Sequence, residues 1–335
     1  MLVKVAITHT TALSAFGVGT RGLARALAGG SFAGMPADQP LANPRARKMM
    51  SRAAYLAARA LADLVRETGW EAAPIGYYLG VGGSGGSLDD VIALLDASLV
   101  DGAFSLTRFG DRGLAACNPL LAFQLMNNFT MCHGAILEGL RGPNSAVFSR
   151  GAGTIAALAE AVYAVRSGEC LHAITGGADA PKHPVTTAEL AREGYLARGL
   201  MPADAVGLLA LARSTSRDEV IVDGVAYVSG RGRPPGQAIV DVFERVSTRD
   251  TGVDVIVIAP WGPPAADTLR AAASARFPEA LILDTTPLGE SLAASPALAV
   301  SAAVDALRDR PGRAAVLTLG VDGDPCAVAL SRGAA

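Results

Sequence analysis

The chain has 335 residues, of which half are apolar and 18% are charged. This is the composition of a core-rich globular protein, and it excludes an intrinsically disordered chain. Lysine and arginine number 29 against 31 acidic residues, so the formal net charge is -2, and no basic run is present. The sequence therefore lacks the basic region that nucleic-acid binding requires.

The first residues, Met1–Thr11, form a short apolar stretch that threonine and histidine interrupt. A signal peptide needs a continuous apolar region, and a membrane span needs about 18 or more apolar residues, which the sequence lacks. We therefore expect a soluble, cytoplasmic protein with no membrane partner. The four cysteines form no C-x-x-C pair, so we expect reduced thiols rather than a zinc site or a disulfide framework.

Short β-branched segments alternate along the chain with Ala/Leu-rich segments of helical period, which predicts an α/β fold with sheets covered on both faces. The expected strands are 4–8, 75–81, 145–149, 171–175, 206–212, 219–228, 253–258, 280–283, 314–319 and 326–330. The expected helices are 52–67, 87–99, 154–167, 265–276 and 292–308. The length exceeds the roughly 100–200 residues of one typical domain. We expect an N-terminal half of residues 1–215 and a shorter C-terminal half of residues 216–335, with a loop at 230–236.

A glycine-rich run from Gly80 to Gly86 follows an expected strand and precedes an expected helix. Its G-x-G-x-x-G spacing is that of dinucleotide-binding loops, in which backbone N–H groups face a pyrophosphate. The run does not follow the first strand, however, and Asp101, the acidic residue near the required spacing, lies in an Asp-Gly turn. We interpret the run as a strand-to-helix turn and expect no cofactor.

The histidines and carboxylates show no ligand spacing. No H-x-x-x-H pair occurs among the four histidines, and no acidic cluster has the spacing of a metal site. G-x-S-x-G is also absent, so the pattern does not indicate a serine hydrolase. We expect no metal.

A more specific series of motifs lies in the middle of the chain. Gly139-Leu-Arg-Gly-Pro-Asn144 precedes an expected strand and a long Ala-rich helix. That helix ends at Arg166-Ser-Gly-Glu169, and the turn Gly176-Gly-Ala-Asp-Ala180 follows the next strand. This order resembles the β-ketoacyl synthases of the thiolase superfamily. The resemblance implies a thiolase-like α/β fold, with two pseudo-duplicated βαβαβ halves in a five-layered α-β-α-β-α arrangement.

The same resemblance places the family's chemical groups on unsuitable residues. The nucleophilic cysteine falls on Gly151, the two catalytic histidines on Ala259 and Glu290, and the lysine on Thr285. Acyl transfer needs a thiolate, and decarboxylation needs imidazole donors at the developing enolate oxygen. We therefore expect these four positions to be vestigial and the chain to have no catalytic residues of its own. The family's G-F-G-G near the last strands is replaced by Gly320-Val-Asp-Gly323.

The family also contains non-catalytic members, the chain-length factors or β subunits of type II polyketide synthases. By resemblance, we expect a heterodimer with an active ketosynthase, an acyl carrier protein as a further partner, and a role in shaping the tunnel for the growing chain. Met126 falls at the tunnel-gating position, with Phe129 and Thr130 one turn later; plain core packing of Met126 and Phe129 is the alternative. The residues expected at the dimer interface are Asn118, Asn128, His133, Arg141, Asn144, Ala146 and Phe148.

Two other functions stay open. One is a stand-alone homodimer that binds acyl chains or acyl carrier protein. The other is an enzyme with changed chemistry, in which Ser149, Arg150 and Glu290 converge in the old pocket. Chain-length factors often carry glutamine at the nucleophile position, so Gly151 indicates a divergent branch.

Overall fold

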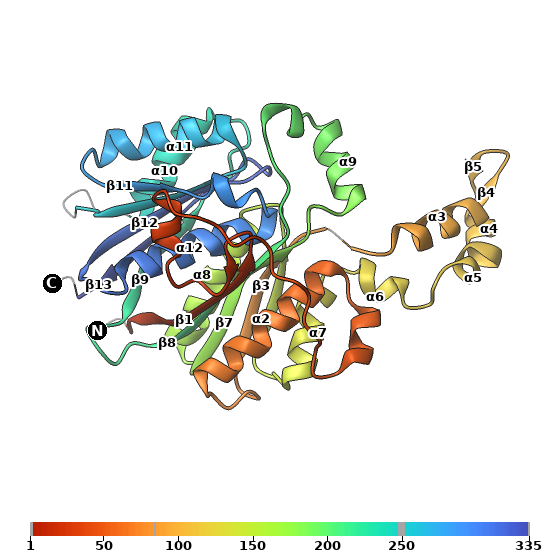
Figure 1. Cartoon of the computed structure of the whole chain (residues 1–335), viewed down its shortest axis with the longest axis horizontal. Helices are drawn as coiled ribbons and strands as arrows, with labels where there is room; N and C mark the ends of the chain where they lie inside the picture. The colour runs from red at the N-terminus through yellow and green to blue at the C-terminus, as the bar shows by residue number, and fades with distance from the viewer. Residues whose placement is uncertain (1–2, 84, 247–251, 334–335) are drawn as a thin grey trace.

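The computed structural model describes residues 3–83, 85–246 and 252–333, and it confirms an α/β fold built on a mixed sheet (Figure 1). Each predicted strand overlaps an observed one. The strands are β1 (Val5–Ser14), β2 (Gly17–Val18), β3 (Gly76–Val81), β4 (Leu99–Val100), β5 (Ala103–Phe104), β6 (Asn144–Phe148), β7 (His172–Asp179), β8 (Ala205–Arg213), β9 (Val220–Tyr227), β10 (Val255–Pro260), β11 (Leu281–Asp284), β12 (Gly312–Leu319) and β13 (Pro325–Arg332).

The five predicted helices are also present, with ends that differ by a few residues. The helices are α1 (Leu23–Leu27), α2 (Arg52–Thr68), α3 (Leu88–Ala97), α4 (Leu106–Arg108), α5 (Leu114–Ala116), α6 (Leu121–Leu125), α7 (Phe129–Glu138), α8 (Gly153–Ser167), α9 (Pro184–Arg192), α10 (Pro235–Val246), α11 (Pro263–Arg276) and α12 (Ser295–Leu307). The predicted loop at 230–236 ends where α10 begins. None of the described helices is long and apolar enough to cross a membrane.

The main sheet has the order β11-β10-β12-β13-β9-β1-β8-β7-β3-β6, with β2 beside β1. A short antiparallel seam between β1 and β9, at the pairs Ala6–Ile221 and Ile7–Val220, joins two groups of five strands. Outward from the seam each group begins with two antiparallel contacts and ends with two parallel ones. The two free edges of this sheet are β6 and β11.

Helices pack on the sheet from several sides. α2 packs on β1, β7 and β8, while α10 and α11 pack on the strands from β9 onward. α8 contacts β3, β7 and β9, and α12 contacts β8, β10 and β12, so these two helices join the two strand groups. The largest hydrophobic cluster accordingly includes buried residues from Val5 to Leu330.

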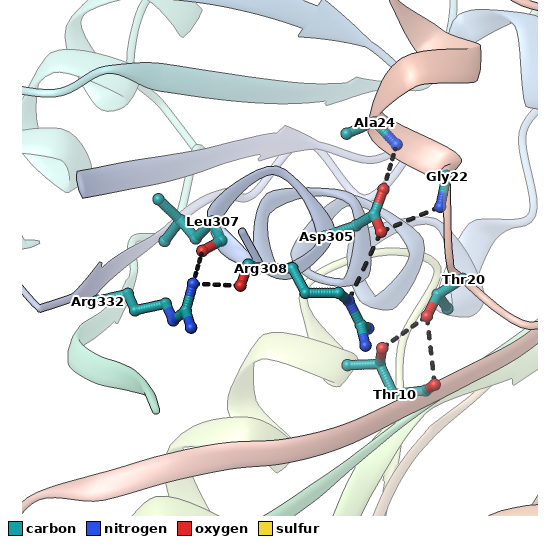
Figure 2. Close-up of polar contacts among 8 residues, drawn as sticks. All are labelled: Thr10, Thr20, Gly22, Ala24, Asp305, Leu307, Arg308 and Arg332. Atoms are coloured by element: carbon teal, nitrogen blue, oxygen red, sulfur yellow. Dashed lines mark hydrogen bonds and ion pairs between the residues drawn. The ribbon is translucent and has the colours of Figure 1, made fainter. Parts of the chain in front are cut away.

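A polar clamp ties the N-terminal segment to the C-terminal end of α12 (Figure 2). The Asp305 carboxylate accepts hydrogen bonds at 3.0 Å from the backbone N–H groups of Gly22 and Ala24, and so satisfies donors at the start of α1. At the same end of α12, Arg332 donates from Nη1 to the carbonyl of Leu307 at 3.1 Å. The clamp therefore satisfies exposed ends of two helices with side chains from distant segments.

Residues 88–125 form an arm that projects away from the body and carries α3, β4, β5, α4, α5 and α6 (Figure 1). Large apolar side chains are exposed along it, and none of the α3 residues is buried. These side chains are Leu88, Ile92, Leu95, Leu99, Val100, Phe104, Leu106, Leu114, Phe123 and Leu125. An exposed apolar surface of this extent is typical of a protein interface.

Candidate functional site

Gly151, where the resemblance predicts the nucleophile position, lies in the turn between β6 and α8, and the loop between β12 and β13 covers it. A Cβ atom at Gly151 would lie 3.0 Å from Oδ1 of Asp322 and 3.0 Å from Cα of Gly320. These distances are tighter than ordinary van der Waals contact. The space for a larger side chain at this position is therefore taken by the chain itself.

Asp322 holds the start of α8 by hydrogen bonds. Its Oδ2 atom accepts from the hydroxyl of Ser149 at 2.5 Å and from the backbone N–H of Ala152 at 2.8 Å. α8 has no side-chain cap of its own, so a carboxylate from a distant loop fulfils that role. The negative charge also lies favourably at the positive end of the helix dipole. The only sequence signal for Asp322 is its place in the altered Gly320–Gly323 segment, and that signal does not indicate the capping role.

The other three positions predicted to be vestigial are buried. Ala259 lies on β10, Thr285 directly after β11, and Glu290 in the segment before α12. Burial raises the pKa of Glu290 well above its usual range, since hydrogen bonds from Ser295 and the Leu292 backbone N–H compensate only in part. The carboxylates of Asp322 and Asp179 raise it further. The region around these positions therefore contains acidic side chains, and it offers no imidazole or ammonium group at these positions.

Ser149 and Arg150 point to different partners. The hydroxyl of Ser149 donates to Asp322, whereas Arg150 forms an ion pair of 2.9 Å with Glu193. Arg150 is thus held by a different acidic residue from the one that binds Ser149. The three side chains named for a changed chemistry do not share a partner, and Ser149 has no histidine base.

The space beside Glu290 is small. The pocket that Glu290 lines has a volume of about 10 Å³, which is about the minimum for one water molecule. Trp261, which also lines it, packs edge-to-face on Tyr195 with ring centroids 4.9 Å apart. The guanidinium of Arg198 lies 4.5 Å from the centre of the Tyr195 ring and 4.9 Å from that of Trp261. This conformation leaves no room for an acyl chain beside Glu290.

The glycine-rich run packs against side chains and backbone. A Cβ atom on Gly80 would overlap Thr154, one on Gly82 would overlap the carboxylate of Asp179, and one on Gly85 would overlap the carbonyl of Gln124. Glycine is needed at these positions because neighbouring groups approach closely. That requirement accounts for the spacing without a nucleotide; Ser84, within the run, lies outside the described residues.

The predicted tunnel residues follow one another around the start of α7. Met126 is 51% exposed, Phe129 is half-buried and Thr130 is buried. Phe129 packs edge-to-face on Phe123, with ring centroids 5.1 Å apart. An exposed methionine is available to a partner, whereas Thr130 faces the interior of its own subunit. The gating role of all three stays a prediction.

The predicted interface residues fall in two environments. The exposed ones are Asn118, Asn128, Arg141, Asn144 and Phe148; Ala146 is half-buried on the edge strand β6, and His133 is buried. The His133 ring lies within 3.1 Å of the Met49 carbonyl, and burial lowers its pKa. The His133 side chain is therefore bound within its own subunit, while the remaining residues are accessible to a partner.

Within the described ranges, no group of three or more histidine, cysteine or acidic side chains is placed to hold a metal ion. All four cysteines carry free thiols, as predicted, and Cys170 and Cys326 are buried. Burial, partly offset by a hydrogen bond to Gly76, raises the pKa of the Cys170 thiol. Such a thiol is a weak nucleophile, because the reactive form is the thiolate.

Three solved structures illustrate the similarity of the fold. A type II polyketide synthase acyl-carrier protein complex with its ketosynthase (AntDE:AntF) aligns with a TM-score of 0.74 at 12% identity, over 99% of both chains. The ishigamide ketosynthase/chain length factor gives 0.72 at 22% identity, over 98% of this chain and 99% of that one. A β-ketoacyl synthase from Burkholderia phymatum STM815 gives 0.73 at 16% identity, with the same coverage.

No curated protein matches the sequence. The family model described as "Beta-ketoacyl synthase, N-terminal domain" matches residues 35–213, which is more than half of the chain. That range contains the motifs from Gly139 to Ala180 and the whole arm. The chain belongs to the β-ketoacyl synthase family.

Proposed function

We propose that this chain is a non-catalytic ketosynthase-like subunit of the chain-length-factor type. It pairs with an active β-ketoacyl-ACP synthase, and the pair accepts substrate from an acyl carrier protein. In this complex the partner forms the carbon–carbon bond, and the present chain shapes the tunnel that receives the growing product.

The observation that carries the proposal is the hydrogen-bonded position of Asp322 against Gly151. In the family, this turn presents the nucleophile at the start of a helix. Here the same helix end is satisfied by an internal carboxylate, which is neither a thiolate nor a donor to an enolate oxygen. The buried Glu290 adds a second acidic group to the same region.

The free edge of β6 supports pairing. Its backbone has a partner strand on one side only, and Phe148 at its end is 59% exposed. Proteins rarely leave such an edge open, because it pairs readily with another chain. The apolar arm projects from the body of the fold, and a partner that covers both the arm and the β6 edge would remove the exposed apolar surface from water.

The proposal extends to the family's duplicated architecture. The strand order and the strand senses are the same on each side of the β1–β9 seam, which is the pattern expected of two pseudo-duplicated halves. α8 and α12 would then form the middle layer of a five-layered arrangement. The predicted division at residue 215 falls in the connection between β8 and β9.

Co-expression with a catalytically complete ketosynthase of a type II polyketide synthase tests the function directly. We expect a 1:1 complex by size exclusion with mass determination, and condensing activity only in that complex. A stable homodimer that ignores the ketosynthase would instead favour the stand-alone acyl- or ACP-binding protein. Condensing activity of the isolated chain would contradict the assignment as non-catalytic.

A further inference from the structure

An open groove lies beside the start of the edge strand β6 and has a volume of about 640 Å³. Asn144 and Ser145 of β6 form one wall, and the exposed face of α8 forms another. The lining residues are Tyr78, Pro143, Asn144, Ser145, Ala156, Ala159, Glu160, Tyr163, Glu169 and Tyr227. The groove is therefore continuous with the strand edge through which we propose that the chain pairs.

The lining of the groove combines acidic and aromatic side chains. Its two charged lining residues, Glu160 and Glu169, are both acidic and exposed, and the lining includes no lysine, arginine or histidine. Among the ion pairs found in the described residues, neither glutamate takes part. Tyr163 is 69% exposed and Tyr227 is 51% exposed, so two aromatic rings stand beside unneutralised carboxylates.

Tyr78, which also lines the groove, lies in the negative potential of the same two glutamates. Burial, the Cys170 thiol and the carboxylates of Glu169 and Glu160 together raise the pKa of Tyr78 to about 12. Two carboxylates beside tyrosine rings suit a guanidinium group, which forms two parallel hydrogen bonds to a carboxylate and stacks on aromatic faces. An ammonium group suits the charge but lacks the planar geometry.

The position beside β6 determines what a second copy would present. Antiparallel pairing of two β6 strands requires a twofold axis perpendicular to the sheet, so the same face carries α8 in both subunits. Each groove would then lie on the same side of the extended sheet as its counterpart. Two acidic grooves on one face of the paired sheet would add like charges to that interface, and like charges disfavour such pairing.

We propose that this groove selects the partner: Glu160 and Glu169, with Tyr163 and Tyr227, receive a basic side chain, preferably arginine, of the active ketosynthase. The same two glutamates disfavour self-association through β6. The inference rests on the proposed function, because it assigns a specificity site to the pairing edge. It adds a reason why the chain would form a heterodimer rather than a homodimer.

The test compares the double variant Glu160→Gln/Glu169→Gln with the unaltered chain. Glutamine keeps the size of each side chain and removes the charge. We expect the variant to bind the co-purified ketosynthase at least about 10-fold more weakly at low salt, with a smaller difference at high salt, where exposed charges are screened. We also expect the isolated variant to show more homodimer by sedimentation than the unaltered chain.

The matched control is Glu67→Gln/Glu279→Gln, which removes two exposed carboxylates outside the groove lining. It should change neither association. Unchanged binding and unchanged self-association of the groove variant would overturn the inference and leave the proposed function intact. Failure of the unaltered chain to bind the ketosynthase would instead overturn the proposed function. In that case, increased homodimer in the groove variant alone would still support the repulsion between grooves.

Discussion

Oδ1 of Asp322 lies 3.0 Å from the point that a side-chain carbon on Gly151 would occupy, although Gly151 lies in the middle of the sequence and Asp322 near its C-terminus. The same carboxylate accepts from Ser149 and from Ala152, the N-cap residue of α8. The predicted nucleophile position and a helix cap thus lie at one place. This relationship allows the site to be tested by stability as well as by activity.

Replacing the cap should destabilise the fold. We expect Asp322→Ala to lower the free energy of unfolding by about 1–2 kcal/mol, because α8 loses its only side-chain cap. Asp322→Asn keeps one acceptor oxygen, so it should lower the free energy of unfolding by less. Urea unfolding measures both, with Asp309→Ala at an exposed position as the control. Equal stability of Asp322→Ala and the control would contradict the capping role.

Glu290 should make the protein less stable in alkaline solution. Because burial raises its pKa in the folded state, the folded protein retains a proton that the unfolded chain releases. The stability that this group contributes is complete below the unfolded pKa and is lost as the pH rises through the folded one. We expect Glu290→Gln to be more stable than the unaltered protein at pH 8, and to depend less on pH between 5 and 9.

That pH series needs a control, because other groups titrate over the same range. Glu279→Gln removes an exposed carboxyl and should follow the unaltered protein throughout. A pH profile of Glu290→Gln identical to that of the unaltered protein would show that Glu290 ionises freely.

The packing of the glycine run predicts a severe substitution. Gly82→Ala would place a Cβ atom into the carboxylate of Asp179, so we expect a loss of at least about 3 kcal/mol or insoluble protein. Gly236→Ala, at the start of α10 with no atom within 4 Å of the new Cβ, should be neutral or slightly stabilising. Thermal unfolding of the two variants checks the contrast; a well-folded Gly82→Ala protein would disprove the packing argument.

The arm should matter for association and not for folding. Leu106 is 76% exposed, so Leu106→Asp should leave the melting temperature of the isolated chain unchanged while weakening the complex at least about 10-fold. Val240→Asp, on the exposed face of α10, changes the charge equally and should have no effect on binding. Titration of each variant against the ketosynthase distinguishes the two, and equal binding would remove the arm from the interface.

Met126 provides the test of product length. If its side chain closes the tunnel in the complex, Met126→Ala should give longer products by steric relief, at an unchanged 1:1 stoichiometry. Product masses from the reconstituted complex measure this. Unchanged lengths would assign Met126 to packing alone. Ile136→Ala, at an exposed position on α7 outside the predicted tunnel residues, serves as the comparison and should leave product length unchanged.

The sequence predicted the sheet well and the site only in part. Buried strands such as β10 appear in the sequence as continuous apolar runs, so they can be predicted without knowledge of distant neighbours. α10 was not predicted, because the Gly- and Pro-rich segment before it favours a loop and obscures the amphipathic pattern that follows. The four positions predicted to be vestigial rest on resemblance, which depends on the order of motifs.

The contacts made by Asp322 and by Asp179 could not be read from the chain. Asp322 and Ser149 are separated by 173 positions, and nothing local to either residue indicates the other. From the sequence alone, Gly82 is likewise interpreted as a turn residue. Only the structure shows that the Asp179 carboxylate lies too close for a larger side chain at this position. His133 is the opposite case, since a motif placed it at an interface while its neighbours bury it.

The hydrophobic cluster that both strand groups share has a consequence for the design of truncated fragments. Side chains of α8 and α12 pack against strands of both groups, so a fragment ending after β8 would leave half of that cluster facing water. Such a fragment would aggregate rather than fold, and the Asp305 clamp would be lost with it. Split or circularly permuted versions should therefore keep both segments in one molecule, or supply them together during synthesis.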